Sequence, residues 1–126
     1  MPDYAGSGQA KLLRENTQAF LWQSESVVAG ELSIAYQLSK VPASFYPYGL
    51  SFELVFSAAP GSFEVDIMGA NTDIATNYIE LGSITAVNAS NVARWDMPSN
   101  LWPRYIAAMA KILTKSAVLV TLAVTR

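Results

Sequence analysis

Apolar residues recur at every second position in two neighbouring stretches near the middle of the chain. These positions are Phe52, Leu54 and Phe56 in the first stretch, and Phe63, Val65 and Ile67 in the second. A period of two places alternate side chains on opposite faces of a β-strand. Pro60 and Gly61 lie between the stretches and favour a turn, because proline presets its φ and glycine accepts a positive one. We therefore predict an antiparallel hairpin over residues 50–69, with the apolar positions on its inner face.

Further strands are predicted on both sides of this hairpin, at residues 17–22, 30–38, 78–87, 92–96 and 117–125. Two of them have a regular apolar face, made of Leu32, Ile34, Tyr36 and Leu38 in one and of Val118, Val120, Leu122 and Val124 in the other. Gly82, inside the strand at 78–87, indicates a β-bulge.

Two segments fit more than one structure. Residues 11–22 fit a helix or an irregular segment that leads into a strand, and we favour the latter. Residues 104–113 carry apolar side chains at both helical and strand spacing. We favour a strand there, because the run is short and leads directly into the closing strand through a predicted turn at Lys115 and Ser116.

About eight strands at this spacing indicate an all-β protein in which two antiparallel sheets bury their apolar faces against each other. A length of 126 residues fits one domain. We expect the β-sandwich to span residues 17–126. Residues 1–16 are expected to be a flexible N-terminal arm, because the first ten residues show no apolar periodicity.

The composition narrows the classes of function. Charged residues make up 14% of the chain, hydrophobic residues 52%, and the net charge is −2. No basic patch suggests a nucleic-acid partner, and no apolar run is long enough to suggest a membrane span. A domain with so few charges is expected to have part of its surface covered by a partner or by copies of itself. The first residues lack the pattern of a signal peptide, so we expect a protein that is not secreted by that route.

Candidate chemistry is sparse. The chain contains no histidine and no cysteine, which removes the commonest general base and the usual zinc ligands. Glu53, Glu64 and Asp66 are expected on the outer face of the hairpin, where a glycosidase-type carboxylate pair is one interpretation and a solvated strand face is the favoured one. Asp66, Asn71 and Asp73 are a candidate for a calcium site built from oxygen ligands, although their spacing matches no EF-hand loop. We expect no enzyme activity, no metal site and no cofactor.

Aromatic residues in or beside loops are the best candidates for contact with a partner. Large aromatic side chains anchor many protein interfaces and also stack on sugars. The predicted interface residues are Tyr4, Phe45, Tyr46, Tyr48, Trp95 and Trp102. The alternative is that the loop aromatics pack beneath the loops as part of the core.

The hairpin and the last third of the chain resemble small structural proteins encoded by tailed bacteriophages. The resemblance lies in residues 51–67, 78–84, 102–108 and 118–125, and it covers roughly residues 45–126. It implies a jelly-roll β-sandwich attached to the capsid shell or the tail of a virion. No catalytic motif accompanies it, so no site residue follows from the resemblance.

The resulting hypothesis is a virion structural protein, a capsid decoration or cement subunit that binds the major capsid protein or other virion proteins and forms a homo-oligomer. Two alternatives remain open. One is a tail, neck or baseplate component, and the other is a carbohydrate-binding β-sandwich module.

Overall fold

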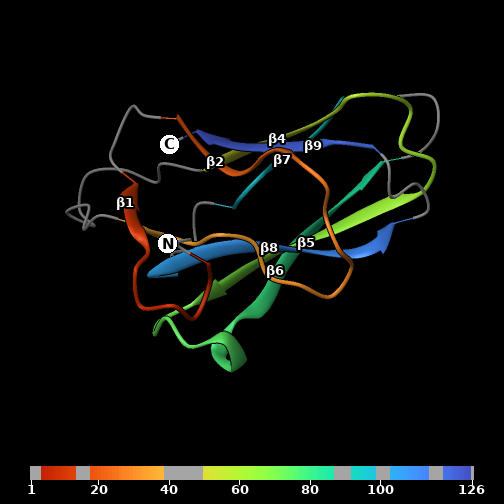
Figure 1. Cartoon of the computed structure of the whole chain (residues 1–126). Coiled ribbons are helices and arrows are strands. Elements are labelled where there is room, and N and C mark those ends of the chain that lie inside the picture. Colours follow the sequence, from red (N-terminus) through yellow and green to blue (C-terminus); the bar gives the residue numbers. More distant parts are fainter. Residues whose placement is uncertain are drawn as a thin grey trace.

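The chain folds into two β-sheets that face each other (Figure 1). The structure is a computed structural model and describes residues 4–13, 18–38, 50–86, 92–98, 103–113 and 118–125. One sheet has the strand order β1-β3-β8-β5-β6, with β1 Lys11–Leu13, β3 Tyr36–Leu38, β8 Tyr105–Leu113, β5 Phe63–Ala70 and β6 Ile79–Ala86. The other has the order β2-β9-β4-β7, with β2 Gln18–Glu25, β9 Val120–Thr125, β4 Ser51–Phe56 and β7 Val92–Asp96. The prediction of an all-β sandwich is confirmed.

All strand pairs are antiparallel except β1 with β3. Within the described residues, the only helical element is the short 3-10 turn η1, Ala75–Asn77. Residues 105–113 form β8, so the strand interpretation of that segment is confirmed. The β-bulge predicted at Gly82 is also confirmed, because the pairing of β5 with β6 shifts in register between Gly82 and Glu80.

The predicted hairpin at residues 50–69 is wrong. Its two strands exist, but β4 pairs with β7 and β9, whereas β5 pairs with β6 and β8 in the opposite sheet. Residues 57–62 therefore cross from one sheet to the other, and Gly61 takes a positive φ of 72° in this crossing. Likewise, β8 and β9 lie in different sheets and do not pair as a hairpin. The turn expected at Lys115 and Ser116 lies outside the described residues.

The predicted inner faces are nevertheless correct. All six apolar positions of β4 and β5 are 4% exposed or less, and they lie in one core cluster between the sheets. The rings of Phe56 and Phe63 meet in this core at a centroid distance of 4.9 Å. The buried face of the last strand, from Val118 to Val124, is confirmed as well. The period of two determines the face of each side chain, whereas the choice of neighbouring strand depends on distant segments.

A second, smaller core lies on the outer face of the five-stranded sheet. It consists of Ala35, Met68, Ala70, Tyr78 and Ala107, with Ala5 and Ala10 of the N-terminal segment packed against it. Leu32 packs against this second core, whereas Leu38 lies in the main core with the half-buried Tyr36 packed against it, so the single apolar face predicted for residues 30–38 is only partly confirmed. Ser33 is also buried. The Ser33 hydroxyl is satisfied, because it accepts a hydrogen bond from the Ala108 N–H at 2.8 Å.

The N-terminal segment also differs from the flexible arm that the sequence predicts. Residues 11–13 form β1 at the edge of the five-stranded sheet, where they pair in parallel with β3. Before them, Tyr4 forms a bridge with Ile34, and the Ala5 N–H donates to the carbonyl of Ser33 at 3.0 Å. Residues 4–13 are therefore bound to the sandwich by backbone hydrogen bonds and by packing.

Candidate functional site

Asp73 holds the N-terminal segment in place. Its Oδ1 accepts hydrogen bonds from the Gly6 N–H at 2.6 Å and from the Tyr78 hydroxyl at 2.6 Å. Its Oδ2 accepts a hydrogen bond from the Gly8 N–H at 2.9 Å. Gly6 has a φ of +88°, and an added Cβ would lie 2.9 Å from the Ala75 nitrogen, so this close approach requires glycine.

The hydrogen bonds to Asp73 change its acidity. Partial burial raises the pKa of Asp73, but the hydrogen bonds from Tyr78, Gly6 and Gly8 outweigh this effect and hold the pKa below its usual value. The pKa of the Tyr78 hydroxyl is raised, first by burial and then by its hydrogen bond to the Asp73 carboxylate. Both Asp73 oxygens accept hydrogen bonds from protein donors, and no three acidic side chains gather around Asp73 in the described residues, so the structure gives no support to the calcium site suggested by the sequence.

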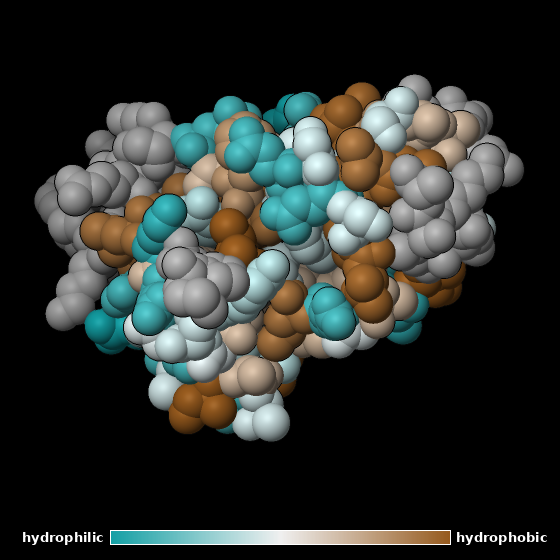
Figure 2. Space-filling model, in the orientation of Figure 1, coloured by the Kyte–Doolittle hydropathy of each residue, from teal (hydrophilic) through white to brown (hydrophobic). Residues whose placement is uncertain are grey.

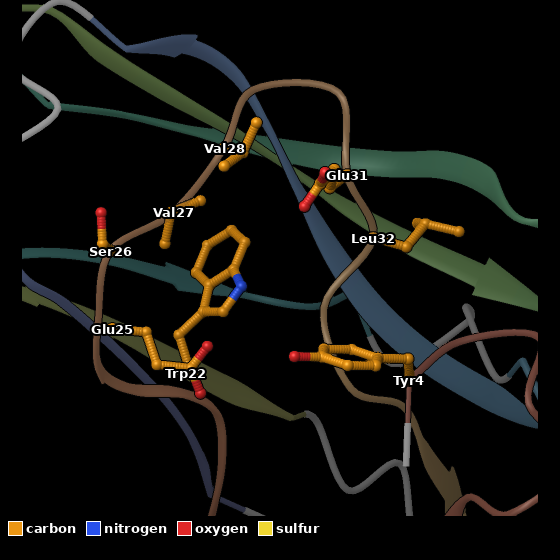
Figure 3. A pocket seen from close by; sticks show the side chains of 8 residues that line it. All are labelled: Tyr4, Trp22, Glu25, Ser26, Val27, Val28, Glu31 and Leu32. Carbon is orange, nitrogen blue, oxygen red and sulfur yellow. The ribbon is translucent and has the colours of Figure 1, made fainter. Parts of the chain in front are cut away.

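Of the predicted interface residues that the structure describes, Tyr4 lies at a cavity. Its side chain is 47% exposed, and it borders a cavity of about 70 Å³ that we call the acidic notch. The notch is lined by Tyr4, Trp22, Glu25, Ser26, Val27, Val28, Glu31 and Leu32. Figure 3 shows the hydroxyl of Tyr4 and the carboxylates of Glu25 and Glu31 pointing toward the gap beside the Trp22 indole.

Three different segments build the acidic notch. Trp22 and Glu25 belong to β2, Glu31 follows the turn at Ala29 and Gly30, and Tyr4 comes from the N-terminal segment. Ser24 adopts a positive φ of 48°, and the pairing of β2 with β9 shifts register between Trp22 and Glu25. These irregularities carry the chain out of the regular pleat, so that the Trp22 ring and the Glu25 carboxylate both reach the notch.

Sequence reasoning missed Trp22, Glu25 and Glu31. Trp22 reads as an ordinary strand residue, and it is in fact 4% exposed and part of the main core. The two glutamates stand singly in the sequence with no motif around them. The bridge between Tyr4 and Ile34 brings the N-terminal segment to the acidic notch. No local sequence pattern predicts this contact between distant segments.

The side chain of Trp95 packs partly inside the molecule. It is half-buried, and its ring lies 5.7 Å from the ring of Phe52 at an angle of 40°. A Cβ added to Gly82 would lie 2.2 Å from the Trp95 ring, so the indole packs directly on the backbone of β6 and links the edges of the two sheets. Of the other predicted interface residues, Phe45, Tyr46, Tyr48 and Trp102 lie outside the described residues.

The carboxylates of the expected solvated face have different environments. Glu53 is exposed, and Glu64 is half-buried with its Oε2 3.4 Å from the Lys111 ammonium. Asp66 is only 9% exposed, and its buried Oδ1 has no hydrogen-bond partner among the described residues. The solvated interpretation is therefore wrong for Asp66, which lies on the outer face of a central strand between two neighbours.

The position of Asp66 raises its pKa. Burial makes the largest contribution, the charge of Glu80 adds to it, and Lys111 opposes it. The Lys111 pKa is raised in turn by its hydrogen bond to Glu64. A carboxyl group of this kind lowers the stability of the fold when it is ionised.

Within the described parts of the chain, no three acidic side chains converge in a way that could hold a metal ion. Over the same residues, no helix is both long and apolar enough to cross a membrane. No protein-family model, curated protein or solved structure matches this chain.

Proposed function

We propose that the protein is a non-enzymatic structural subunit of a tailed-bacteriophage virion, of the decoration or cement type that binds the capsid shell. The observation that carries the proposal is the nested pairing of the strands. The pairs β5–β6, β4–β7, β3–β8 and β2–β9 are all antiparallel. Along the chain, the two strands of each pair flank the two strands of the pair before it.

This nesting supports a jelly-roll fold. Eight strands that pair as one long hairpin, and whose members are divided between two sheets, are the pattern of a jelly roll. Here β2, β9, β4 and β7 form one sheet, and β3, β8, β5 and β6 lie together in the other. Viral capsid domains and lectins use jelly rolls. The resemblance of residues 45–126 to phage structural proteins favours the viral alternative.

The exposed surface supports an adhesive role. Several large apolar side chains are open to solvent, among them Ile79 at 64% and Ile74 at 50%. Figure 2 shows hydrophobic atoms in several separate places on one face of the molecule, including the region of η1. With 14% charged residues, such a surface is suited to contact with a large assembly.

The sheet edges support self-association. The edge strands are β1 and β6 in one sheet and β2 and β7 in the other. A strand at the edge of a sheet can be extended by a strand of a second chain. A homo-oligomer on the particle surface would multiply weak contacts into firm attachment.

A tail, neck or baseplate component remains the alternative within the virion, and copy number separates it from a shell subunit. The carbohydrate-binding alternative is less favoured. One of its predicted stacking platforms, Trp95, packs against Gly82 and Phe52 rather than standing free.

The test is quantitative mass spectrometry of purified particles from the source. We expect the chain in intact particles at a copy number that scales with the major capsid protein. A number that matches the tail proteins indicates the tail alternative, and particles that lack the chain overturn the proposal. A glycan array provides the control for the lectin alternative, for which we expect no bound sugar.

A further inference from the structure

We infer that Asp66 on β5 keeps its proton and donates it in a hydrogen bond to the carboxylate of Glu80 on β6, and that this bond makes the attachment of the edge strand β6 dependent on pH. The device is a property of the sandwich itself and is independent of the proposed function. It involves a buried carboxyl group to which an adhesive surface gives no role.

Asp66 occupies a place that suits a neutral carboxyl group. It is 9% exposed and lies on the central strand β5, opposite Ser83 of β6 and Met109 of β8. Its Oδ1 is shielded from water and receives no hydrogen bond from any described residue. Burial without hydrogen-bond donors destabilises an ionised carboxylate far more than a neutral carboxylic acid. The geometry therefore favours the protonated form of Asp66.

The β-bulge in β6 brings Glu80 to the same face of the sheet. The register between β5 and β6 shifts after Ile67, so that Met68 pairs with Glu80 and not with Leu81. Leu81 instead packs against the main core. In an unshifted register Leu81 would lie on the outer face and Glu80 would face the core, because successive side chains alternate. Met68 and Asp66 are two residues apart on β5 and share the outer face, so Glu80 is a diagonal neighbour of Asp66.

The two carboxyl groups are in contact. The side chains of Asp66 and Glu80 are hydrogen-bonded to each other. Carboxylates only accept hydrogen bonds, so a bond between two carboxyl groups requires a proton on one of them. Glu80 is exposed and water solvates its charge, whereas Asp66 is buried. The proton therefore resides on Asp66, and Glu80 is the acceptor.

The other charged groups on this face do not replace the proton. They are Glu64 on β5 and Lys111 on β8, and the Lys111 ammonium lies 3.4 Å from Glu64 Oε2. Burial makes the largest contribution to the raised pKa of Asp66, the charges of Glu80 and Glu64 add to it, and Lys111 opposes it. The nearby cation is thus bound by Glu64, and the pKa of Asp66 stays above its usual value.

The edge strand β6 is the element that such a bond affects most, because β5 is its only neighbour in the five-stranded sheet. The hydrogen bond is complete below the unfolded pKa of aspartate, about 3.9, and it is lost as the pH rises through the higher folded pKa of Asp66. Two adjacent carboxylates then repel each other across the strand pair. We expect β6 to be held most firmly in acid and to open more often as the pH rises.

The first measurement follows the side-chain carboxyl carbon of Asp66 in the full chain by ¹³C NMR between about pH 3 and pH 9. We expect its midpoint to lie above the ordinary value of about 3.9. In Glu80→Gln the midpoint should fall by about one pH unit, because the amide is uncharged and can donate a hydrogen bond to ionised Asp66. Glu53→Gln, at an exposed site in the other sheet, is the matched control and should leave the midpoint unchanged.

The second measurement is amide hydrogen exchange in β6, expressed as protection factors so that the intrinsic pH dependence of exchange cancels. We expect protection in β6 to fall about threefold to tenfold as Asp66 ionises, while protection in β4 of the other sheet stays unchanged. In Asp66→Asn the amide can donate to Glu80 at every pH, so the pH dependence of protection in β6 should disappear.

Three results would overturn the inference. They are an Asp66 midpoint at or below about 3.9, a midpoint that Glu80→Gln does not change, and protection in β6 that falls with pH in Asp66→Asn as it does in the wild type. If Asp66→Asn does not fold, the wild-type titration and Glu80→Gln, at an exposed site, decide. Both measurements use the isolated protein, so the presence or absence of the chain in virions tests the proposed function separately.

Discussion

The rings of Phe56 and Phe63 meet edge to face, with centroids 4.9 Å apart and planes inclined by 67°, although the two residues belong to opposite sheets. Phe56 is the last residue of β4, and Phe63 is the first residue of β5. The chain therefore crosses the sandwich between them, and the contact closes the core at the point of crossing.

This contact gives the first prediction. Phe56→Ala and Phe63→Ala should each lower the free energy of unfolding by about 3–5 kcal/mol, because each removes a buried aromatic ring and leaves a cavity. The double variant should be less destabilised than the sum, by about 0.5–1.5 kcal/mol, because the pair interaction is lost only once. Urea unfolding of the four proteins measures both quantities. Strict additivity would mean that the rings do not interact.

The second prediction concerns the seam between β6 and β7. Gly82→Ala should destabilise the fold by about 1–3 kcal/mol, because the new Cβ would overlap the Trp95 ring. In a Trp95→Ala background the same substitution should be close to neutral. Thermal unfolding of the single and double variants tests this. An equal cost in both backgrounds would show that Trp95 is not the obstacle.

The third prediction concerns Asp73. Asp73→Asn should destabilise the protein at pH 7 by about 1–3 kcal/mol, because an amide has one acceptor oxygen and cannot serve Gly6, Gly8 and Tyr78 as the carboxylate does. Hydrogen exchange at the Gly6 and Gly8 amides should accelerate in the variant. Unchanged exchange at both amides would rule out this anchoring role.

The pH dependence of Asp73 follows from its lowered pKa. The stability that its ionised form contributes is complete above the unfolded pKa of about 3.9 and is lost as the pH falls through the lower folded pKa. The difference in unfolding free energy between wild type and Asp73→Asn should therefore shrink below about pH 4. A constant difference down to pH 2 would contradict the assignment.

Asp66 should behave in the opposite way. Its folded pKa is raised, chiefly by burial and then by Glu80, so its ionisation at higher pH costs stability. Asp66→Asn should unfold at higher denaturant concentration than the wild type at pH 7. The advantage should disappear below the unfolded pKa of about 3.9, where the carboxyl is neutral in both states. Glu53→Gln, at an exposed site, is the control and should change stability by less than about 0.5 kcal/mol.

The candidate site was only partly predictable. Tyr4 stands out as an aromatic residue in a polar N-terminal segment, and it does line the acidic notch. Glu25 and Glu31 carry no such signal, because their role depends on a register shift in β2 and on the bridge from Tyr4 to Ile34. The burial of Asp66 was equally unpredictable. The alternation of apolar and polar residues along β5 correctly places Asp66 on the outer face, but it does not show which neighbouring side chains cover that carboxyl group.

The sequence by itself determined which side chains of β4, β5 and β9 face the core and where most strands lie. Those properties depend on the two-residue period of an extended backbone, which is local. Only the tertiary structure decided that β4 and β5 lie in opposite sheets and that residues 4–13 cover and extend one of them. An apolar face can be buried by a strand beside it or by a sheet opposite it, and contacts between distant segments select the arrangement that buries all the faces together.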